Sequence, residues 1–307
     1  MPKAVLSELK KYPVHITSIT SMVDDGGSSG QLRKDFNILP PGDIRRHILA
    51  LSDAPNWKKK LWDFRFGHET FDGGHKGHNF ANVFIGGLEH ATGDYRITLE
   101  IAHNFLEVKK HRALPATIDK TQLVALLENG KEIFGENEID IPKKHNENLK
   151  IEKIYLKPEA KAYLPVLKCI KRSDIIIIGP GDLYSSLLPC FLPQGISRAI
   201  KKSQAKKILV CNVMTKRGET NGFSVLDFAN ETEKYFGCQL DFVIYNSQIP
   251  SVKRIKETIK KEPYLQKLVA INKNLDKKKF IETKILEKNS PLAYNSAKLI
   301  KVIMGLT

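Results

Sequence analysis

Short apolar runs separated by helical patterns are the feature that most constrains how this chain can fold. Ile175–Ile178 is apolar at every position, which is typical of a parallel strand covered on both faces. The other strand-like runs are Val14–Val23, Ile208–Val213 and Phe242–Tyr245. Helical patterns separate them, at Ile44–Ser52, Tyr95–Val108, Glu159–Ile170, Ile196–Lys202 and Ser224–Phe236. This alternation predicts βαβ units and a doubly wound α/β fold with a mostly parallel sheet.

The alternation of strand-like runs and helical patterns is interrupted between residues 112 and 140. Two β-like runs, Leu123–Leu127 and Lys131–Phe134, flank Asn129-Gly130, a pair that strongly favours a hairpin turn. We interpret this region as a small antiparallel β insertion. Since no repeat, low-complexity tract or linker divides the chain, we expect one domain over residues 1–307.

Positive charge is concentrated towards the carboxyl end. The 307 residues carry a net charge of +15, and residues 251–307 hold fourteen Lys and Arg against five Asp and Glu. Apolar positions alternate with these lysines, so we expect folded helices and strands with solvated basic faces. A nucleic-acid groove would interleave more aromatic side chains, so nucleic acid is disfavoured as a partner and a smaller anion is favoured.

The chain shows no sign of membrane insertion or export. Its apolar runs are too short to span a bilayer, and the first residues contain no secretory apolar region, so we expect a cytoplasmic protein without a membrane span. The four cysteines form no C-x-x-C pair and fit reduced thiols better than disulfides or a zinc site: Cys169, Cys190, Cys211 and Cys238.

The segment after the first predicted strand has the composition of a ligand-binding loop. It reads Asp24, Asp25, Gly26, Gly27, Ser28, Ser29, Gly30, followed by Arg33 in a helical stretch. Glycines let the backbone approach a phosphate, and amides and hydroxyls at a helix N-terminus supply donors. The two carboxylates suit ribose hydroxyls or a Mg²⁺ ion that bridges to phosphate oxygens. The alternative is a flexible turn.

A second strand-to-helix loop follows the same logic. Gly179, Gly181, Tyr184 and Ser185 come directly after Ile175–Ile178 and combine glycines with hydroxyls. Because ligands of doubly wound sheets bind at the carboxyl ends of the strands, the two glycine loops together predict a site there. Neither loop matches the phosphate-binding loop of nucleotide hydrolases or G-x-G-x-x-G.

Two helix starts add candidate side chains. Asp43 is predicted as a helix N-cap, with Arg45 in the first turn available for a diphosphate. Gly77-His78-Asn79 is predicted to cap the helix that runs through His90, with His78 and Asn82 directed at the ligand. The alternative is that His78 caps the helix and Asn82 bonds a neighbouring loop.

A zinc site in the histidine-rich stretch is disfavoured. The stretch contains His68, Glu69, His75 and His78, with His90 further along. Its spacing does not match H-E-x-x-H, and no cysteine is near in sequence.

Six ordered segments resemble the gluconeogenesis factor (YvcK-like) family of the CofD-like superfamily. They are VDDGGSSGQLR, LPPGDIR, GHNFAN, LPATID, GPGDLYSSLLP and VCNVMTKRGETNGF, and the resemblance runs from about Leu6 to Ser247. It implies a Rossmann-like fold and a site for a UDP-sugar or another nucleoside diphosphate, in a protein that supports growth on gluconeogenic carbon sources and normal cell shape. It identifies the following positions as lining the cleft: Asp24 to Gly30, Asp43, Arg45, His78, Asn79, Asn82, Gly179, Gly181, Tyr184, Ser185, Asn212 and Thr215.

The same resemblance leaves the activity open. The more distant CofD branch transfers a phospholactyl group from a guanosine diphosphate donor with Mg²⁺, and this implies Asp24 and Asp25 as candidate metal ligands. No other cofactor is implied. A transferase is therefore the alternative to a binding protein, and a homo-oligomer is left open.

The sequence departs from the family pattern in three places. Asp182 replaces a small residue, usually Ser, after G-P-G. The family's usual G-H-S-L-G-N reads GHNFAN here, so we expect Phe80 and Ala81 to narrow that helix start. Relatives also begin with a strand and a glycine-rich loop before the segment that matches Ala4–Tyr12. We expect that Met1 is an internal methionine of the natural protein.

Overall fold

The computed structural model describes residues 2–67, 77–288 and 292–307. His68, Glu69 and His75 of the histidine-rich stretch lie outside the described residues. The strands are β1 (Thr17–Thr20), β2 (Arg112–Pro115), β3 (Gln122–Leu127), β4 (Glu132–Phe134), β5 (Ile151–Lys157), β6 (Ile175–Ile178), β7 (Lys206–Val210), β8 (Met214–Lys216), β9 (Phe242–Asn246), β10 (Leu265–Leu268) and β11 (Phe280–Thr283).

Helices connect these strands, and five of them coincide with the predicted helical stretches. The helices are α1 (Pro2–Leu9), α2 (Gly27–Phe36), α3 (Gly42–Leu51), α4 (Asn56–Asp63), α5 (Phe80–Thr92), α6 (Tyr95–Phe105), α7 (Glu136–Asp140), α8 (Leu164–Arg172), η1 (Leu183–Leu187), η2 (Leu188–Phe191), α9 (Ile196–Lys202), α10 (Val225–Phe236), α11 (Val252–Lys261) and α12 (Ser296–Gly305).

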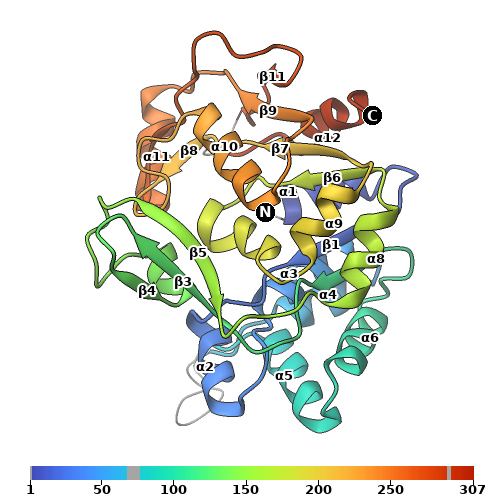
Figure 1. Ribbon diagram of the computed structural model, residues 1–307. Coiled ribbons are helices and arrows are strands. Elements are labelled where there is room, and N and C mark those ends of the chain that lie inside the picture. Colours follow the sequence, from blue (N-terminus) through green and yellow to red (C-terminus); the bar gives the residue numbers. More distant parts are fainter. Residues whose placement is uncertain (1, 68–76, 289–291) are drawn as a thin grey trace.

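Two parallel sheets form the centre of the molecule (Figure 1). The larger has the order β11-β9-β7-β6, and the smaller pairs β1 with β2. Along β7, Ile208 and Val210 enter one apolar core and Leu209 enters the other, so both faces of the sheet are buried. The predicted doubly wound, mostly parallel α/β fold is therefore confirmed.

Helices cover both faces of these sheets. Apolar side chains of α1, α3 and α12 share one core with Ile208, while those of α8, α9 and α10 share the other with Leu209. The basic carboxyl-terminal part is folded, as predicted: β11 pairs with β9, and Leu299 and Ile300 of α12 are fully buried.

The antiparallel insertion is larger than the sequence predicts. β3 and β4 form the expected hairpin, with Gly130 at a φ of 81° in its turn. A third strand, β5, pairs with β3 from beyond residue 140, and β2 belongs to the central parallel pair instead. Because the pairing partner of β2 lies about 95 residues earlier, local periodicity cannot separate it from the insertion.

Several predicted boundaries shift for local reasons. The ladder of β1 ends at Thr20, since Ser21 to Val23 already lead into the loop. α8 begins at Leu164 rather than Glu159, because Pro165 is best accommodated in the first turn of a helix. The prediction that Asp43 is an N-cap is wrong: Pro41 holds that position, and Asp43 lies inside the first turn of α3.

Within the described part of the chain, no helix is both long enough and apolar enough to cross a membrane. All four cysteines are free thiols, as predicted.

Candidate functional site

The loops after β1, β6 and β7 meet at the carboxyl end of the central strands. The backbone N–H of Gly181 donates to Oδ1 of Asn212, 3.4 Å away, which joins the loop after β6 to the loop after β7. Burial raises the pKa of Glu136, and the nearby carboxylates of Asp24, after β1, and Asp140, from the insertion, raise it further. The structure thus brings predicted residues from three strands together with carboxylates that the sequence analysis did not single out.

Asp24 turns into this site. Its Oδ1 accepts the N–H of Gly26 (3.0 Å), and burial raises its pKa above the ordinary value. A Cβ atom at Gly42 would lie 2.5 Å from Oδ2 of Asp24 and 2.4 Å from Oγ of Ser29. Only glycine therefore lets the start of α3 approach this carboxylate so closely.

Asp25 turns the other way, towards the insertion. Its Oδ1 accepts the N–H of Asn137 at 2.8 Å, in the first turn of α7. A Cβ at Gly135 would come within 2.4 Å of its Oδ2. Asp25 thus links the loop after β1 to the insertion. Asp24 and Asp25 are neighbours in sequence, but their carboxylates have different surroundings.

The carboxylates of Asp24, Asp43 and Glu136 crowd together at this site. Burial raises the pKa of Asp43 to about 6, and the Asp24 carboxylate adds to this increase. Burial likewise raises the pKa of Glu136 to about 10. Smaller contributions to this increase come from the carboxylates of Asp24, Asp140, Asp43 and Asp25. Such a cluster either keeps protons or binds a cation, because like charges in a poorly solvated site disfavour full ionisation.

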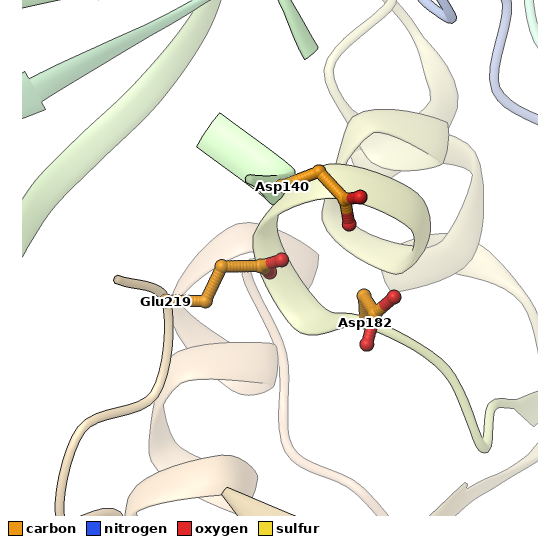
Figure 2. Close-up of side chains that lie close together, drawn as sticks. All are labelled: Asp140, Asp182 and Glu219. Carbon is orange, nitrogen blue, oxygen red and sulfur yellow. The ribbon is translucent and has the colours of Figure 1, made fainter. Parts of the chain in front are cut away.

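Asp140, Asp182 and Glu219 form a second acidic cluster (Figure 2). A lysine side chain neutralises part of its charge. Among the described residues, these three are the one group whose potential metal-ligating atoms all lie within 4.8 Å of one another. The ammonium group of Lys216 pairs with Asp140, with Asp182 at 3.0 Å and with Glu219 at 3.2 Å. Burial opposes its charge, but the three carboxylates outweigh burial and raise its pKa.

Glu219 also occupies the helix start after the G-P-G loop. Its Oε2 accepts the N–H groups of Tyr184 (2.8 Å) and Ser185 (3.2 Å), and its Oε1 accepts the Ser185 hydroxyl at 2.9 Å. These are the donors that the sequence analysis assigned to a phosphate. A carboxylate of the protein itself already satisfies them.

The start of α5 lies against the start of α2. Asn79 caps α5, as predicted, by accepting the N–H groups of Ala81 and Asn82. The Ser28 hydroxyl lies 2.8 Å from Nδ1 of His78 and accepts Nδ2 of Asn82 at 3.1 Å. Oδ1 of Asn82 is buried without a hydrogen-bond partner among the described residues. His78 and Asn82 are thus positioned by α2, and Asn82 retains one acceptor.

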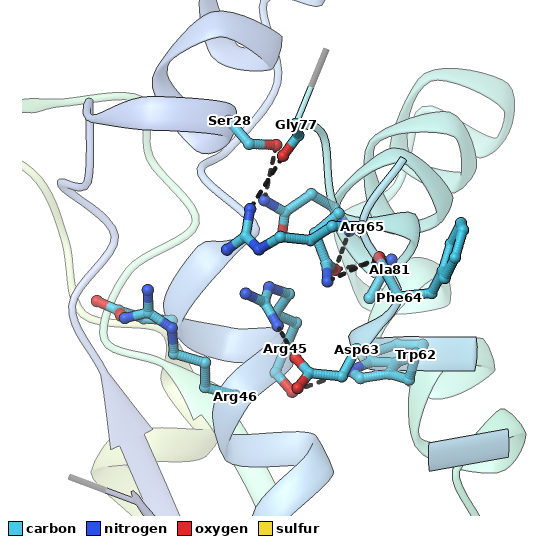
Figure 3. A network of polar contacts seen from close by, with 12 residues as sticks. Ser28, Arg45, Arg46, Trp62, Asp63, Phe64, Arg65, Gly77 and Ala81 are labelled. Atoms are coloured by element: carbon cyan, nitrogen blue, oxygen red, sulfur yellow. Dashed lines mark hydrogen bonds and ion pairs between the residues drawn. The ribbon is translucent and has the colours of Figure 1, made fainter. Parts of the chain in front are cut away.

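Three arginines gather beside this contact (Figure 3). Arg45 is only 4% exposed; its Nη1 lies 3.1 Å from Oδ1 of Asp63, and its Nε has no partner within residues 2–67, 77–288 and 292–307. Burial lowers the pKa of Arg45, and the charges of Arg46 and Arg65 lower it further. Arg65 donates to the Gly77 carbonyl at 3.0 Å. An anion bound here would relieve the mutual repulsion of these guanidinium groups.

The remaining predicted residues have less direct positions. Gly27, Ser28, Ser29 and Gly30 form the first turn of α2 rather than a loop, which turns backbone N–H groups towards the site. Arg33 donates to the carbonyls of Val23 and Thr121, so its guanidinium holds backbone segments together. Thr215 is fully buried, and its hydroxyl donates to the Lys267 carbonyl at 3.3 Å. Gly179 lies close to the Val210 carbonyl at a φ of 80°.

Sequence reasoning missed Arg65, Glu136, Asp140, Lys216 and Glu219. Lys216 and Glu219 lie inside the quoted segment VCNVMTKRGETNGF. The sequence shows that both side chains are charged, but it does not show that they pair. The other three lie outside every quoted motif. No local signal marks them, because their partners are far away in sequence.

Residues 3–290 match the family model described as 2-phospho-L-lactate transferase CofD. The chain belongs to the CofD family. The resemblance stated from the six segments is therefore confirmed.

The chain is also similar to individual proteins over most of its length. It is 34% identical to the gluconeogenesis factor of Halalkalibacterium halodurans, over 98% of this chain and 91% of that protein. A Thermotoga maritima protein is 39% identical over 83% of each chain. A solved structure of a UPF0052 family protein from Bacillus halodurans superposes with a TM-score of 0.88 at 31% identity, over 99% of this chain and 95% of that one.

Proposed function

We propose that this CofD-family protein binds a UDP-sugar at the carboxyl ends of β1, β6 and β7 and acts as a regulator of growth on gluconeogenic carbon sources and of cell shape. The three arginines carry this proposal. The buried Arg45 guanidinium, whose Nε has no hydrogen-bond partner among the described residues, lies beside two further guanidinium groups and suits a diphosphate much better than a neutral ligand.

The neighbouring polar groups support a sugar nucleotide over a simple anion. Ser28, His78 and Asn82 can both donate and accept, which suits the hydroxyl groups of a sugar or ribose. They come from the starts of α2 and α5, whose N-termini favour negative charge. The ligand would then lie with its diphosphate at Arg45 and Arg65 and its sugar or ribose at Asn82.

The alternative is a transferase that uses a nucleoside diphosphate donor. The crowding of Asp24, Asp43 and Glu136 favours this candidate, because oxygen ligands of this kind fit Mg²⁺. A Mg²⁺ ion held there would neutralise charge on the diphosphate. In either function, Asp25 and Lys216 keep the loops around the site in place.

Calorimetric titration distinguishes these functions. UDP-N-acetylglucosamine and GDP would each be titrated with and without Mg²⁺, and a short DNA duplex would be titrated at two salt concentrations. Binding of the UDP-sugar without a Mg²⁺ requirement supports the regulator, and Mg²⁺-dependent binding of GDP supports the transferase. Duplex binding that weakens steeply with salt would contradict both.

A matched pair of variants tests the arginine cluster itself. Arg65→Gln should weaken UDP-sugar binding about tenfold, because one charge-assisted contact to the diphosphate is lost. Arg198→Gln on the outer surface of α9 removes the same charge from an exposed position and should leave affinity unchanged. Equal affinities of the two variants would place the anion elsewhere.

A further inference from the structure

Two strongly exposed apolar side chains follow the carboxyl end of β9. Among the large apolar side chains of the described residues, Ile249 (84% exposed) and Val252 (68% exposed) are the most exposed. Pro250 between them is buried, so the segment is attached to the body of the protein while the side chains on either side of it point into solvent. The fold therefore presents both apolar side chains at one place on the surface.

Hydrogen bonds fix the backbone on both sides of Ile249. The N–H of Ser247 donates to the Thr283 carbonyl at 2.8 Å, which continues the pairing of β9 with β11. Ser251 caps α11, because its hydroxyl oxygen accepts the N–H of Arg254 at 3.4 Å. The exposure of Ile249 thus belongs to an anchored loop and not to a frayed chain end.

α11 itself is held by one side only. Thr258 is buried, and its hydroxyl oxygen accepts the N–H of Leu292 at 3.1 Å. Arg254 donates to the Glu287 carbonyl at 2.6 Å. Since Arg254 and Thr258 are four residues apart, these contacts lie on the same side of the helix and leave its opposite side to solvent.

A row of lysines occupies the outer side of α11. Lys253, Lys256 and Lys260 are spaced by three and four residues, so they lie along one side of the helix, and all three are exposed. The segment 252–262 contains five Lys and Arg against two Glu, so its positive charge is not balanced locally. Val252 is one helical turn before Lys256, which places apolar and basic side chains on a common surface.

The chemistry of this surface suits an extended anionic layer with an apolar interior. Lysines on the outside of a helix converge on no pocket, so a single small anion would contact few of them. Nucleic-acid surfaces of this kind typically use aromatic side chains for stacking, and α11 contains none. A lipid bilayer offers phosphate groups to the lysines and hydrocarbon just below them to Ile249 and Val252.

We propose that this surface docks on the face of a bilayer that contains anionic lipids. The apolar pair enters the headgroup region, and the lysines bind lipid phosphates. The contact is peripheral, since the described part of the chain contains no helix that could cross a membrane. The docking surface consists of Ile249, Val252, Lys253, Lys256 and Lys260.

Docking would bring the candidate functional site close to the lipid surface. β7 and β9 are parallel neighbours, so the loop after β7 and the loop that carries Ile249 leave the same edge of the sheet. The loop after β7 contains Asn212, and its Val213 carbonyl accepts the N–H of Val269 beyond β10. The surface that docks and the site proposed for the nucleotide therefore share one edge of the sheet.

Co-sedimentation with lipid vesicles tests this proposal. The full chain would be mixed with vesicles of phosphatidylglycerol and phosphatidylcholine in equal parts, and with vesicles of phosphatidylcholine alone. We expect it to sediment with the first and to stay in solution with the second. Failure to sediment with the anionic vesicles would overturn the proposal.

Four variants assign the binding to the surface. Ile249→Ser should weaken binding to the anionic vesicles about tenfold, because an apolar side chain no longer enters the bilayer. Lys256→Gln should weaken it about fivefold, the usual effect of one basic residue near an anionic membrane. Leu164→Ser and Lys171→Gln are the matched controls on α8, which lies across the molecule from α11 in Figure 1, and both should bind as the parent does.

Three results would contradict docking by this surface. Equal losses in the α8 variants would show that net charge alone brings the protein to the vesicles. An Ile249 variant that binds as tightly as the parent would exclude insertion of the apolar pair. Tighter binding to a short DNA duplex than to the vesicles would assign the lysines to nucleic acid. Because Ile249 and Lys256 lie outside the arginine cluster, their variants should bind the UDP-sugar normally, so this proposal and the proposed function can fail separately.

Discussion

The ammonium group of Lys216 lies 3.2 Å from the carboxylate of Glu219, and both side chains are removed from solvent. Glu219 in turn accepts the backbone N–H groups at the start of η1. The lysine therefore stabilises, through one carboxylate, the helix start that follows the G-P-G loop.

Replacing Lys216 by Met should lower the free energy of unfolding by about 3–5 kcal/mol at pH 7, because three carboxylates would lose their buried cation. The loss should shrink as the pH falls, since the unpaired carboxylates of the variant then take up protons. Urea unfolding at pH 7 and pH 5 measures both effects. Lys301→Met on the exposed side of α12 is the control, and a loss no larger than in that variant would contradict the pairing.

Glu136→Gln should stabilise the protein by about 4–5 kcal/mol at pH 8. Its pKa is raised to about 10 in the folded state, above the ordinary value of 4.5. The folded state therefore becomes less stable, relative to the unfolded one, as the pH rises from about 4.5 towards 10, and the amide removes this dependence. Below pH 4 the variant and the parent should be equally stable.

Thermal unfolding across this pH range would provide the measurement. Glu100→Gln on the exposed face of α6 is the matched control and should change stability little at any pH. A Glu136 variant that is less stable than the parent at pH 8 would show that the carboxylate is needed in its ionised form.

Gly42→Ala should destabilise the protein and disturb the site together, because its Cβ would lie 2.5 Å from Oδ2 of Asp24. We expect a loss of about 1–3 kcal/mol, as for other overpacked positions. Gly87→Ala in α5 is a suitable comparison, since its Cβ would meet nothing within 4 Å. That variant should gain about 0.5–1 kcal/mol from helix propensity. Equal stabilities in chemical unfolding would refute the close approach.

Asp25→Ala should cost stability more than affinity, because Asp25 accepts the N–H of Asn137 at the start of α7. We expect a loss of about 1–2 kcal/mol in unfolding free energy and little change in UDP-sugar binding. Asp25→Asn keeps an acceptor oxygen and should restore most of the stability. A variant that unfolds normally but no longer binds in the presence of Mg²⁺ would instead make Asp25 a metal ligand.

Asn82→Ala should lower UDP-sugar affinity by about 1–2 kcal/mol, because a buried acceptor next to Ser28 would be lost. Asn104→Ala on the exposed face of α6 is the matched control. Calorimetric titration of the two variants measures the difference. Binding by the Asn82 variant within error of the parent would exclude Asn82 as a ligand contact.

The sequence alone was sufficient to predict the parallel sheet. The apolar run Ile175–Ile178 and the helical patterns around it predict buried parallel strands, and glycine loops at strand ends predict where a ligand binds. The Asn129-Gly130 hairpin could be predicted for the same reason: its turn requires a backbone geometry that few residues adopt.

Only the tertiary structure decided what each polar side chain contacts. Lys216 and Asp140 are separated by 76 positions, and Asp25 and Asn137 by 112, so no local periodicity links them. The neighbours Asp24 and Asp25 look equivalent in sequence, yet one faces the site and the other the insertion. The spacing of apolar residues predicts which positions are buried, because every member of an element contributes to that pattern. The partner of a charged side chain cannot be predicted in this way, because only the tertiary fold brings the two residues together.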